Sequence, residues 1–392
     1  MVSILVGMYG SHRLQMAEDV VQEALIRAMK TWPLHGTPDE PAAWLLRTAK
    51  NLAVDQLRRE QTFHRKQPEI LAGMEDVEEG PGDGGDDLVR LLFVCCHPAL
   101  PGEAQTALAL KTLCGFSAGE IAKAFLISEV AVMKRLTRAR QKIRELALPF
   151  AMPEESEISE RLDPVFRVIY LLFNEGYKAS SGERLVREEL CAEAIRLAGI
   201  ILEEPLTRTP RGFALLALMQ LCAARLPART DDAGNLLRLH EQDRGVWDWE
   251  LIAAGMRNLA RSGAGSSVSE YHVEAAIAAC HCAAADPTAT DWVKILGFYD
   301  RLVEMNDSPV VALNRAVAVA RVSGPLAGLE AIEAISGSQR LEGYHLYHVI
   351  RGVLLGELGR NDEGVVHFRQ ALELTEVPAE REFIARRMQG LG

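Results

Sequence analysis

The sequence predicts an all-α protein, with two small helical modules followed by a longer helical region. Amphipathic runs rich in Ala and Leu, each ending at Gly or Pro, follow one another from residue 160 onward, and alternating strand patterns are scarce. An acidic segment rich in Gly separates two helical blocks in the first part of the chain. At 392 residues the chain is long enough for two or three domains with a real core.

Composition limits the class of protein. The chain is 48% hydrophobic and 25% charged, which is ordinary for a globular protein. No apolar run approaches the ~20 residues that a membrane span needs, and the start, MVSILVGMYGSHR, lacks the basic segment of a signal peptide. The seven cysteines lie mostly in apolar helical patterns, which indicates reduced thiols and a cytoplasmic location.

The charge is unevenly placed along the chain. The net charge is -11, yet residues 1–150 carry only about -1 of it and the remainder about -10. Residues 67–90 hold eight acids and one base, so the first part without them carries about +6. Screening limits the reach of distant acids to about 8–10 Å. A local basic face is therefore enough to attract a phosphate backbone.

Residues 119–144, GEIAKAFLISEVAVMKRLTRARQKIR, resemble a helix-turn-helix. Ser117 and Glu120 form a capping box for the first helix, and Ser128 can cap the second. Leu126 occupies the turn position often held by Gly. By helical spacing we expect four residues of the second helix to face the core: Val130, Met133, Leu136 and Ile143.

The second helix of such a motif enters the major groove of DNA, and its N-terminal residues reach the base edges. The residues expected nearest the bases are Ser128, Glu129, Ala131, Lys134 and Arg135. Arg138 and Arg140 are expected near phosphates. The alternative is a solvated basic helix that binds no nucleic acid.

Two earlier stretches strengthen the DNA-binding interpretation: AEDVVQEALIRAMKTW at 17–32 and PAAWLLRTAKNLAVDQLRRE at 41–60. Together with the helix-turn-helix, they resemble bacterial sigma factors of the extracytoplasmic-function type. An acidic D-x-x-Q-E helix comes first, then a helix of the form A-W-L-x-x-x-A-x-N-x-x-x-D-x-L-R-R. The matching residues here are Asp19, Gln22, Glu23, Trp44, Asn51, Asp55, Arg58 and Arg59.

The resemblance implies a role for each helix. The helix with Asp19, Gln22 and Glu23 would dock core RNA polymerase. The helix from Ala42 to Arg59 would capture the melted minus-ten element of promoter DNA, which requires bases and stacking groups. The residues expected to bind DNA there are Arg47, Lys50, Asn51, Arg58 and Arg59. Trp44 is a stacking group or, as its Ala/Leu-rich setting favours, a core residue, and Asp55 is expected to orient Arg58 or Arg59.

The expected domains are a sigma region 2 module at 1–66, a flexible acidic linker at 67–88 and a sigma region 4 module at 89–147. The family's first helix is nearly absent, so either the start is truncated or that helix is short. The cysteine pairs at 95–96 and at 280 and 282 lack a second pair at zinc-like spacing. We interpret them as mostly buried small hydrophobic residues, and we expect no metal and no cofactor.

The remaining region, 160–392, is expected to be a helical extension. Its segment 344–378 resembles a tetratricopeptide repeat, with Gly352 at a small-residue position of the first helix, Gly359 ending that helix, and Phe368 and Ala371 packing from the second. Gly364 replaces the usual Ala. A poorer copy precedes it, which places the repeats at about 309–388, and such stacks bind peptides or proteins. A regulatory protein is therefore a possible partner of the extension.

The polar cluster from Glu241 to Asp248 has three interpretations. Asp243 and Asp248 as catalytic carboxylates lack any accompanying nucleophile, phosphate loop or metal set in the sequence, so we expect no enzyme. A structural ion-pair corner and a contact surface on the sigma modules stay open. The rival to a sigma factor is a free-standing helix-turn-helix regulator with a repeat-type sensor domain. The sequence leaves open the promoter, the inducing signal, the oligomeric state and whether the extension activates or inhibits.

Overall fold

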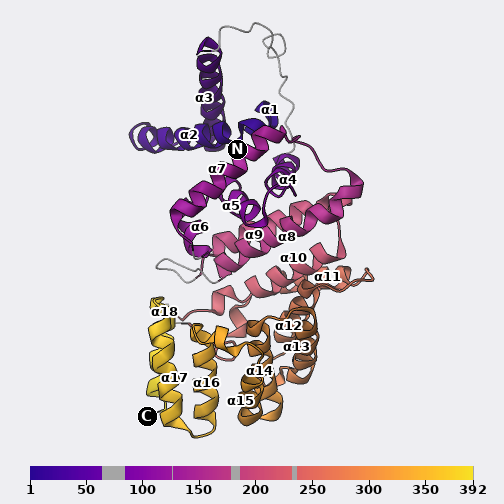
Figure 1. The fold of residues 1–392 in the computed structure, drawn as a ribbon, viewed down its shortest axis with the longest axis vertical. Coiled ribbons are helices and arrows are strands. Elements are labelled where there is room, and N and C mark those ends of the chain that lie inside the picture. Colours follow the sequence, from indigo (N-terminus) through magenta and orange to yellow (C-terminus); the bar gives the residue numbers. More distant parts are fainter. Residues whose placement is uncertain (64–83, 126, 178–185, 232–235, 392) are drawn as a thin grey trace. The chain divides into compact units, whose positions relative to one another are not determined.

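The computed structural model describes residues 1–63, 84–125, 127–177, 186–231 and 236–391. They divide into two compact units, Met1–Val168 and Ile169–Gly392. Every regular element in the described ranges is a helix, apart from one antiparallel bridge between Thr230 and Leu236 (Figure 1). The prediction of an all-α fold is confirmed. None of the helices in those ranges combines the length and the apolar character needed to cross a membrane.

The first three helices of unit 1 are α1 (Val2–Tyr9), α2 (Leu14–His35) and α3 (Pro41–Phe63). Helix α1 spans eight residues, and it buries Leu5 and Val6 completely. Helices α2 and α3 pack against each other through small residues, among them Ala28, Ala49 and Ala53. Small side chains let two helix backbones approach closely and leave the longer polar side chains on the outer faces.

The second part of unit 1 consists of α4 (Gly84–Cys95), α5 (Gly102–Thr112), α6 (Ala118–Ala124) and α7 (Glu129–Leu146). Because α4 begins at Gly84, the last five residues of the expected linker are helical. Residues 67–83 of that linker lie outside the described part of the chain. Cys95 and Cys96 are completely buried, and burial raises the pKa of Cys96 to about 12, so both behave as small apolar side chains.

Helix α8 (Glu155–Tyr177) begins in unit 1 and ends in unit 2. Its first half packs within unit 1, where Arg161 donates a hydrogen bond of 2.9 Å to the Phe93 carbonyl. The same guanidinium lies 5.6 Å from the centre of the Phe93 ring. The start expected at residue 160 for the extension therefore falls inside a helix that unit 1 uses.

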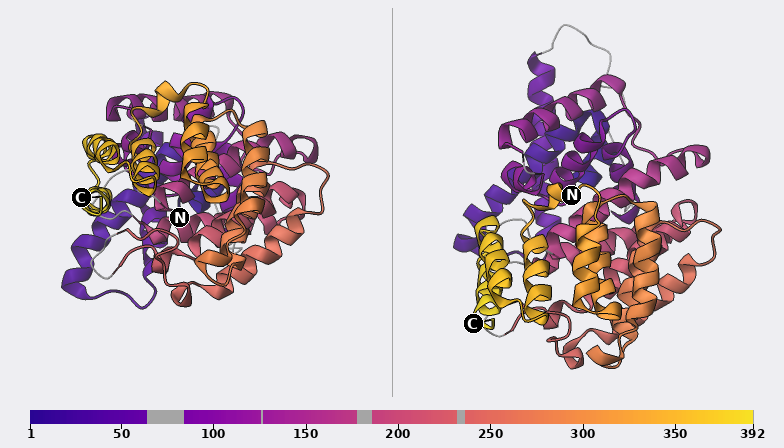
Figure 2. Two further views of the ribbon diagram at one scale, coloured as in Figure 1. Left: turned by 90° about the horizontal axis from the view of Figure 1, so that it is seen from below. Right: turned by 60° about the horizontal axis from the view of Figure 1, so that its bottom comes forward.

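Unit 2 is a succession of helices in which each packs against its neighbour in the chain. They are α9 (Glu188–Glu203), α10 (Pro210–Ala223), α11 (Trp249–Ser262), α12 (Glu270–Ala283), α13 (Trp292–Met305), α14 (Pro309–Ser323), α15 (Pro325–Glu333), α16 (His345–Glu357), α17 (Asn361–Leu374) and α18 (Pro378–Gln389). The later helices stand side by side in the right-hand view of Figure 2. Such an array buries its apolar faces between successive layers.

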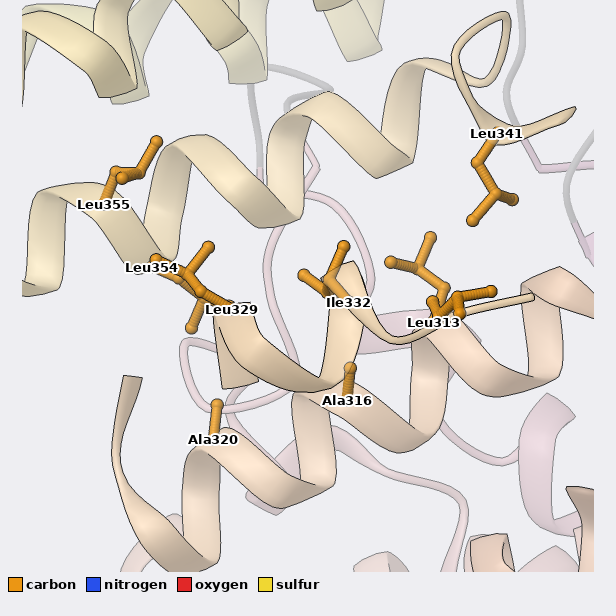
Figure 3. Packing of buried hydrophobic residues seen from close by; sticks show 9 residues of the cluster. Leu313, Ala316, Ala320, Leu329, Ile332, Leu341, Leu354 and Leu355 are labelled. Atoms are coloured by element: carbon orange, nitrogen blue, oxygen red, sulfur yellow. The ribbon is translucent and has the colours of Figure 1, made fainter. Parts of the chain in front are cut away.

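One core of this array lies where α14, α15 and α16 meet (Figure 3). Leu313 and Ala316 of α14 face Leu329 and Ile332 of α15, and all four are buried. A Cβ added at Gly328 would lie 2.5 Å from the Ala320 Cβ, so the close approach of α14 and α15 requires a glycine there.

The packing positions predicted within segment 344–378 are confirmed. Phe368 and Ala371 of α17 are buried at 1% and 0% exposure. A Cβ at Gly352 would lie 3.0 Å from the Phe368 ring, and Gly359 ends α16 with φ +75. The glycine at 364 also has a packing reason, because a Cβ there would lie 2.8 Å from the Leu391 side chain.

Candidate nucleic-acid interface

Helices α6 and α7 begin with the caps that the sequence predicts. The Ser117 amide donates to Glu120 Oε2 at 2.8 Å, and the Glu120 amide donates to Ser117 Oγ at 3.1 Å. Ser128 Oγ accepts from the Ala131 amide at 3.3 Å. The caps satisfy backbone donors that have no partner inside the helix, and they fix where each helix starts. The turn residue Leu126 lies outside the described residues.

The buried face of α7 differs from the expected one. Leu136 and Ile143 are buried, but Val130 and Met133 are 63% and 48% exposed. The positions that share the core with Leu136 and Ile143 are Val132 and Ala139. Spacings of four, three and four residues keep one face of a helix with 3.6 residues per turn, whereas Val130, six residues before Leu136, lies on another face. The assignment of Val130 and Met133 to the core is wrong.

The outer face of α7 therefore mixes apolar and basic groups. Ser128, Glu129, Lys134 and Arg138 are exposed, and a shallow hollow is lined by Glu129, Val130, Met133, Lys134, Thr137 and Arg138. Arg135 is less free than expected, because its Nη2 lies 2.6 Å from a carboxylate oxygen of Glu103 in α5. Such a face suits a DNA groove, since base edges offer both acceptors and thymine methyl groups.

Arg140 lies in an enclosed ion pair instead of on the surface. Its Nη2 is 2.6 Å from Glu18 Oε2 of α2, and the two side chains are 10% and 12% exposed. Thr112 Oγ1 donates to the other oxygen of the same carboxylate at 2.5 Å. Ser11 Oγ adds a hydrogen bond to the Leu148 carbonyl. These contacts tie α2 and the segment just before it to α5 and α7, so the structure pairs Arg140 with Glu18 where a phosphate contact was expected.

Helix α3 presents a second basic face. Arg47, Asn51, Arg58 and Arg59 are exposed and Lys50 is half-buried, while Ala49, Ala53 and Leu57 form the buried side. Trp44 is half-buried, and its ring meets that of Trp32 edge to face at 5.6 Å. Trp44 thus helps to hold α2 against α3. Asp55 is exposed, and its expected role in orienting an arginine stays a prediction.

The residues of α2 predicted to dock core polymerase lie on its exposed face. Asp19, Gln22 and Glu23 are all exposed, and Glu23 Oε1 accepts from Arg27 Nε at 3.1 Å. Sequence reasoning missed the apolar residues beside them: Leu25 is 45%, Ile26 36% and Met29 77% exposed. Leu25, Ile26 and Met29 follow Gln22 by three, four and seven residues, which places them on the same side of the helix. This spacing was a signal available in the sequence.

In unit 2 the two carboxylates considered and set aside as catalytic, Asp243 and Asp248, act as helix caps. Asp243 Oδ1 accepts from the Gly245 amide and Asp248 Oδ1 from the Leu251 amide, each at 2.8 Å. Trp247 is 3% exposed. Of the two open interpretations, these contacts favour a structural corner.

Glu241 completes this corner with two ion pairs, to Arg238 at 2.9 Å and to Arg387 of α18 at 2.8 Å. Burial alone acts to raise the pKa of Glu241. The hydrogen bonds and charge of Arg238, with the charge of Arg387, outweigh it and lower that pKa to about 2. Across the described ranges no three His, Cys, Asp or Glu side chains are grouped to hold a metal ion.

Comparison with known proteins identifies the family to which the chain is similar. Residues 1–63 match sigma-70 region 2 and residues 90–143 match sigma-70 region 4. The ECF RNA polymerase sigma factor SigL of Mycobacterium tuberculosis is 32% identical over 33% of this chain and 72% of its own length. SigG of the same species is 28% identical over 46% of this chain and 54% of its own length.

The two regions define a sigma-70-type transcription initiation factor. Within that class, the chain belongs to the extracytoplasmic-function RNA polymerase sigma factors. An uncharacterized protein of Rhizobium meliloti is 40% identical over 96% of this chain and 90% of its own length, so the resemblance extends through the extension. Residues 161–263 match a family of unknown function, DUF6596, and the tetratricopeptide assignment stays a prediction. No solved structure matches the chain.

Proposed function

We propose that this sigma factor divides promoter recognition among three helices of unit 1. The exposed face of α2 docks core RNA polymerase, α3 holds the melted strand of the promoter, and α7 reads duplex DNA upstream. The observation that carries this proposal is the outer face of α7, where Lys134 and Arg138 are exposed beside Val130 and Met133 in a chain of net charge -11. A basic strip on one helix is the footprint of a nucleic-acid contact.

The docking proposal is supported by the composition of the α2 face. Gln22 and Glu23 lie beside three exposed apolar side chains, Leu25, Ile26 and Met29. Protein interfaces commonly combine an apolar centre with a polar surround, and Met is enriched in them. A free-standing regulator that binds DNA without polymerase has no need of such a face.

We assign the extension the role of a fused regulatory domain. Each of the helices α14–α18 packs against its neighbour in the chain, as the helices of repeat proteins do, and helical-repeat stacks bind peptides or proteins. The extension is permanently present at high effective concentration, so an inhibitor in this position would need its own release signal. A domain that supports polymerase engagement needs none, and we favour that role. As a sigma factor the protein acts in the cytoplasm, where the polymerase is.

Substitution of α2 tests the docking surface. The double variant Gln22→Ala, Glu23→Lys should bind core polymerase at least about 30-fold more weakly, since losing a polar contact and reversing a charge within an interface together cost about 2 kcal/mol or more. The measurement is co-purification and titration with core polymerase, with circular dichroism to confirm the fold. Glu160→Lys, an exposed charge reversal on α8, is the matched control. Normal binding by the double variant would favour the free-standing regulator instead.

A truncation tests the extension. The chain should end after Tyr177, because a stop at residue 160 would remove Arg161 and its bond to the Phe93 carbonyl in unit 1. We expect lower promoter-specific transcription from the truncated protein, provided that it remains folded by circular dichroism. Higher transcription would instead identify the extension as an inhibitor. Equal transcription would leave it as a binding platform for another partner.

A further inference from the structure

The extension contains a basic cavity that promoter recognition does not use. It measures about 480 Å³, and Arg238, Arg244 and Arg321 lie in its wall together with Trp292. The segment before α11 supplies Arg238 and Arg244, α14 supplies Arg321, and α13 begins at Trp292. Small-molecule sites typically occupy roughly 300–1,000 Å³, so the cavity has the size of a ligand site.

Carboxylates balance the arginines of this cavity only in part. Glu357 lines the cavity and lies 3.7 Å from Arg321. Glu241 forms ion pairs with both Arg238 and Arg387, so one carboxylate is shared between two arginines. Arg244 donates to the carbonyl oxygens of His281, at 2.9 Å, and Ala284. Carbonyl oxygens hold a guanidinium in place without cancelling its charge, and the carboxylate that acts on Arg244, Asp286, is exposed. A positive excess results in a region that is acidic as a whole.

Two histidines in the wall experience this positive potential. Burial, followed by the charges of Arg225 and Arg244, lowers the pKa of His281 to about 4. Burial and the neighbouring arginines, Arg238 first, also lower the pKa of His240, against the opposing charge of Glu241. Both histidines are therefore neutral near pH 7.

The wall also has polar atoms without partners and an apolar side. Within the described residues, the Nε atoms of Arg238 and Arg244 and the Nδ1 atom of His281 are buried and lack a hydrogen-bond partner. An unpaired buried polar atom carries a free-energy cost, and these three belong to residues that line the cavity. The apolar part of the wall is the indole ring of Trp292, which meets the His281 ring edge to face with 5.4 Å between ring centres.

We propose that this cavity binds a small phosphate monoester that carries a planar ring, as a mononucleotide does. The arginines hold the phosphate, because a guanidinium pairs with phosphate oxygens through two parallel hydrogen bonds. A phosphate monoester carries a charge of roughly -1.5 to -2 at pH 7, which matches a site with more arginines than carboxylates. The ring packs on Trp292. Through such a site, a small molecule would act on the sigma factor by binding to its extension.

Calorimetry with the full chain tests this proposal, with adenosine monophosphate as the probe and adenosine and inorganic phosphate as its two halves. Adenosine monophosphate should bind more tightly than either half. Arg321→Gln should weaken its binding roughly tenfold, the effect of one charge-assisted hydrogen bond. Glu357→Gln should strengthen it, a change in the opposite direction that general damage to the fold does not produce. Trp292→Leu should bring the affinity for the nucleotide towards that for phosphate.

Arg301→Gln is the matched control, because Arg301 is an exposed arginine of α13 paired with Glu304 and does not line the cavity. Circular dichroism and thermal unfolding establish that each variant is folded. Three results would overturn the proposal: no binding of adenosine monophosphate at concentrations on the order of 1 mM, equal binding by the Arg321→Gln and Arg301→Gln variants, or weaker binding after Glu357→Gln.

Discussion

Helix α7 and the cavity of the extension both gather arginines in an acidic protein, but they arrange them differently. On α7, Lys134 and Arg138 are exposed along one helix face with apolar neighbours. In the extension, Arg238 and Arg244 are half-buried and held by carboxylate or carbonyl oxygens. An open strip suits a long polyanion, whose many phosphates contact mobile side chains in water. A walled site with fixed guanidiniums suits a single small anion.

Arg140 shows that a basic residue of α7 is not necessarily available to contact DNA. It lies in the same helix as Arg138, yet Glu18 and its neighbours enclose it. Exposure and partner, which the sequence does not display, decide whether an arginine binds a ligand or stabilises the fold.

The largest effect is expected from breaking this ion pair. Arg140→Ala leaves Glu18 buried without a counter-charge and should lower the free energy of unfolding of unit 1 by about 3–5 kcal/mol. Urea unfolding of the full chain, followed by circular dichroism, measures the change. Arg138→Ala is the control on the same helix and should cost less than about 0.5 kcal/mol, because Arg138 is exposed. A loss below about 1 kcal/mol for Arg140→Ala would show that the pair is not enclosed in solution.

The next effect concerns DNA binding by α7. If Arg138 contacts a base, Arg138→Ala should weaken binding to a promoter duplex by about 1–3 kcal/mol. If it contacts a phosphate, the substitution should reduce by about one unit the slope of the logarithm of the binding constant against the logarithm of the salt concentration. Arg135→Ala should cost less, because Glu103 already holds Arg135. Fluorescence anisotropy over a range of salt concentrations separates these cases, with Arg144→Ala in the last turn of α7 as the control. Equal losses at the three positions would indicate non-specific attraction alone.

The smallest effect is a pH dependence in the extension. His367 of α17 contacts His348 at 3.2 Å and Arg351 at 3.3 Å. Burial first, then Arg351 and His348, lower its pKa to about 4, against the opposing charge of Glu363. Because the folded state binds this proton less readily than the unfolded state, the stability contribution is complete above about pH 6.5 and falls as the pH decreases towards 4.

In the His367→Gln variant, the free energy of unfolding of the extension should therefore decrease less steeply as the pH is lowered. The expected change is at most about 1 kcal/mol after allowance for solvent screening. Urea unfolding at a series of pH values measures it, and His35→Gln, an exposed histidine in α2, is the control. An unchanged decrease in His367→Gln would assign the loss of stability to other groups.

Local signals in the sequence predicted local structure well. The caps at Ser117 and Ser128 formed as expected, because they depend on residues within one helical turn. Gly352 and Phe368 were placed correctly, since they pack on each other between two helices that are neighbours in the chain, α16 and α17. The core face of α7 was misassigned because several apolar residues offered two possible faces, and only the packing of the module selected Val132 over Val130.

Features that depend on distant residues were not predictable. The partner of Arg140 comes from α2, and nothing in the spacing of either helix indicates the pair. The cavity of the extension joins Arg244, Trp292 and Arg321 from separate helices and loops. The sequence did single out the polar residues around Asp243 and Asp248, but their use as helix caps became evident only from the backbone amides they face.

The most direct test of promoter recognition by this sigma factor is run-off transcription with core polymerase of its own host on pooled genomic fragments. Core polymerase alone should give no defined start sites, and addition of the protein should give a small set of promoter-specific transcripts. The double variant Lys134→Ala, Arg138→Ala should lose those transcripts while still binding core polymerase. Promoter-specific transcription at the wild-type level by that variant would contradict the account, because α7 would then have no part in choosing the promoter.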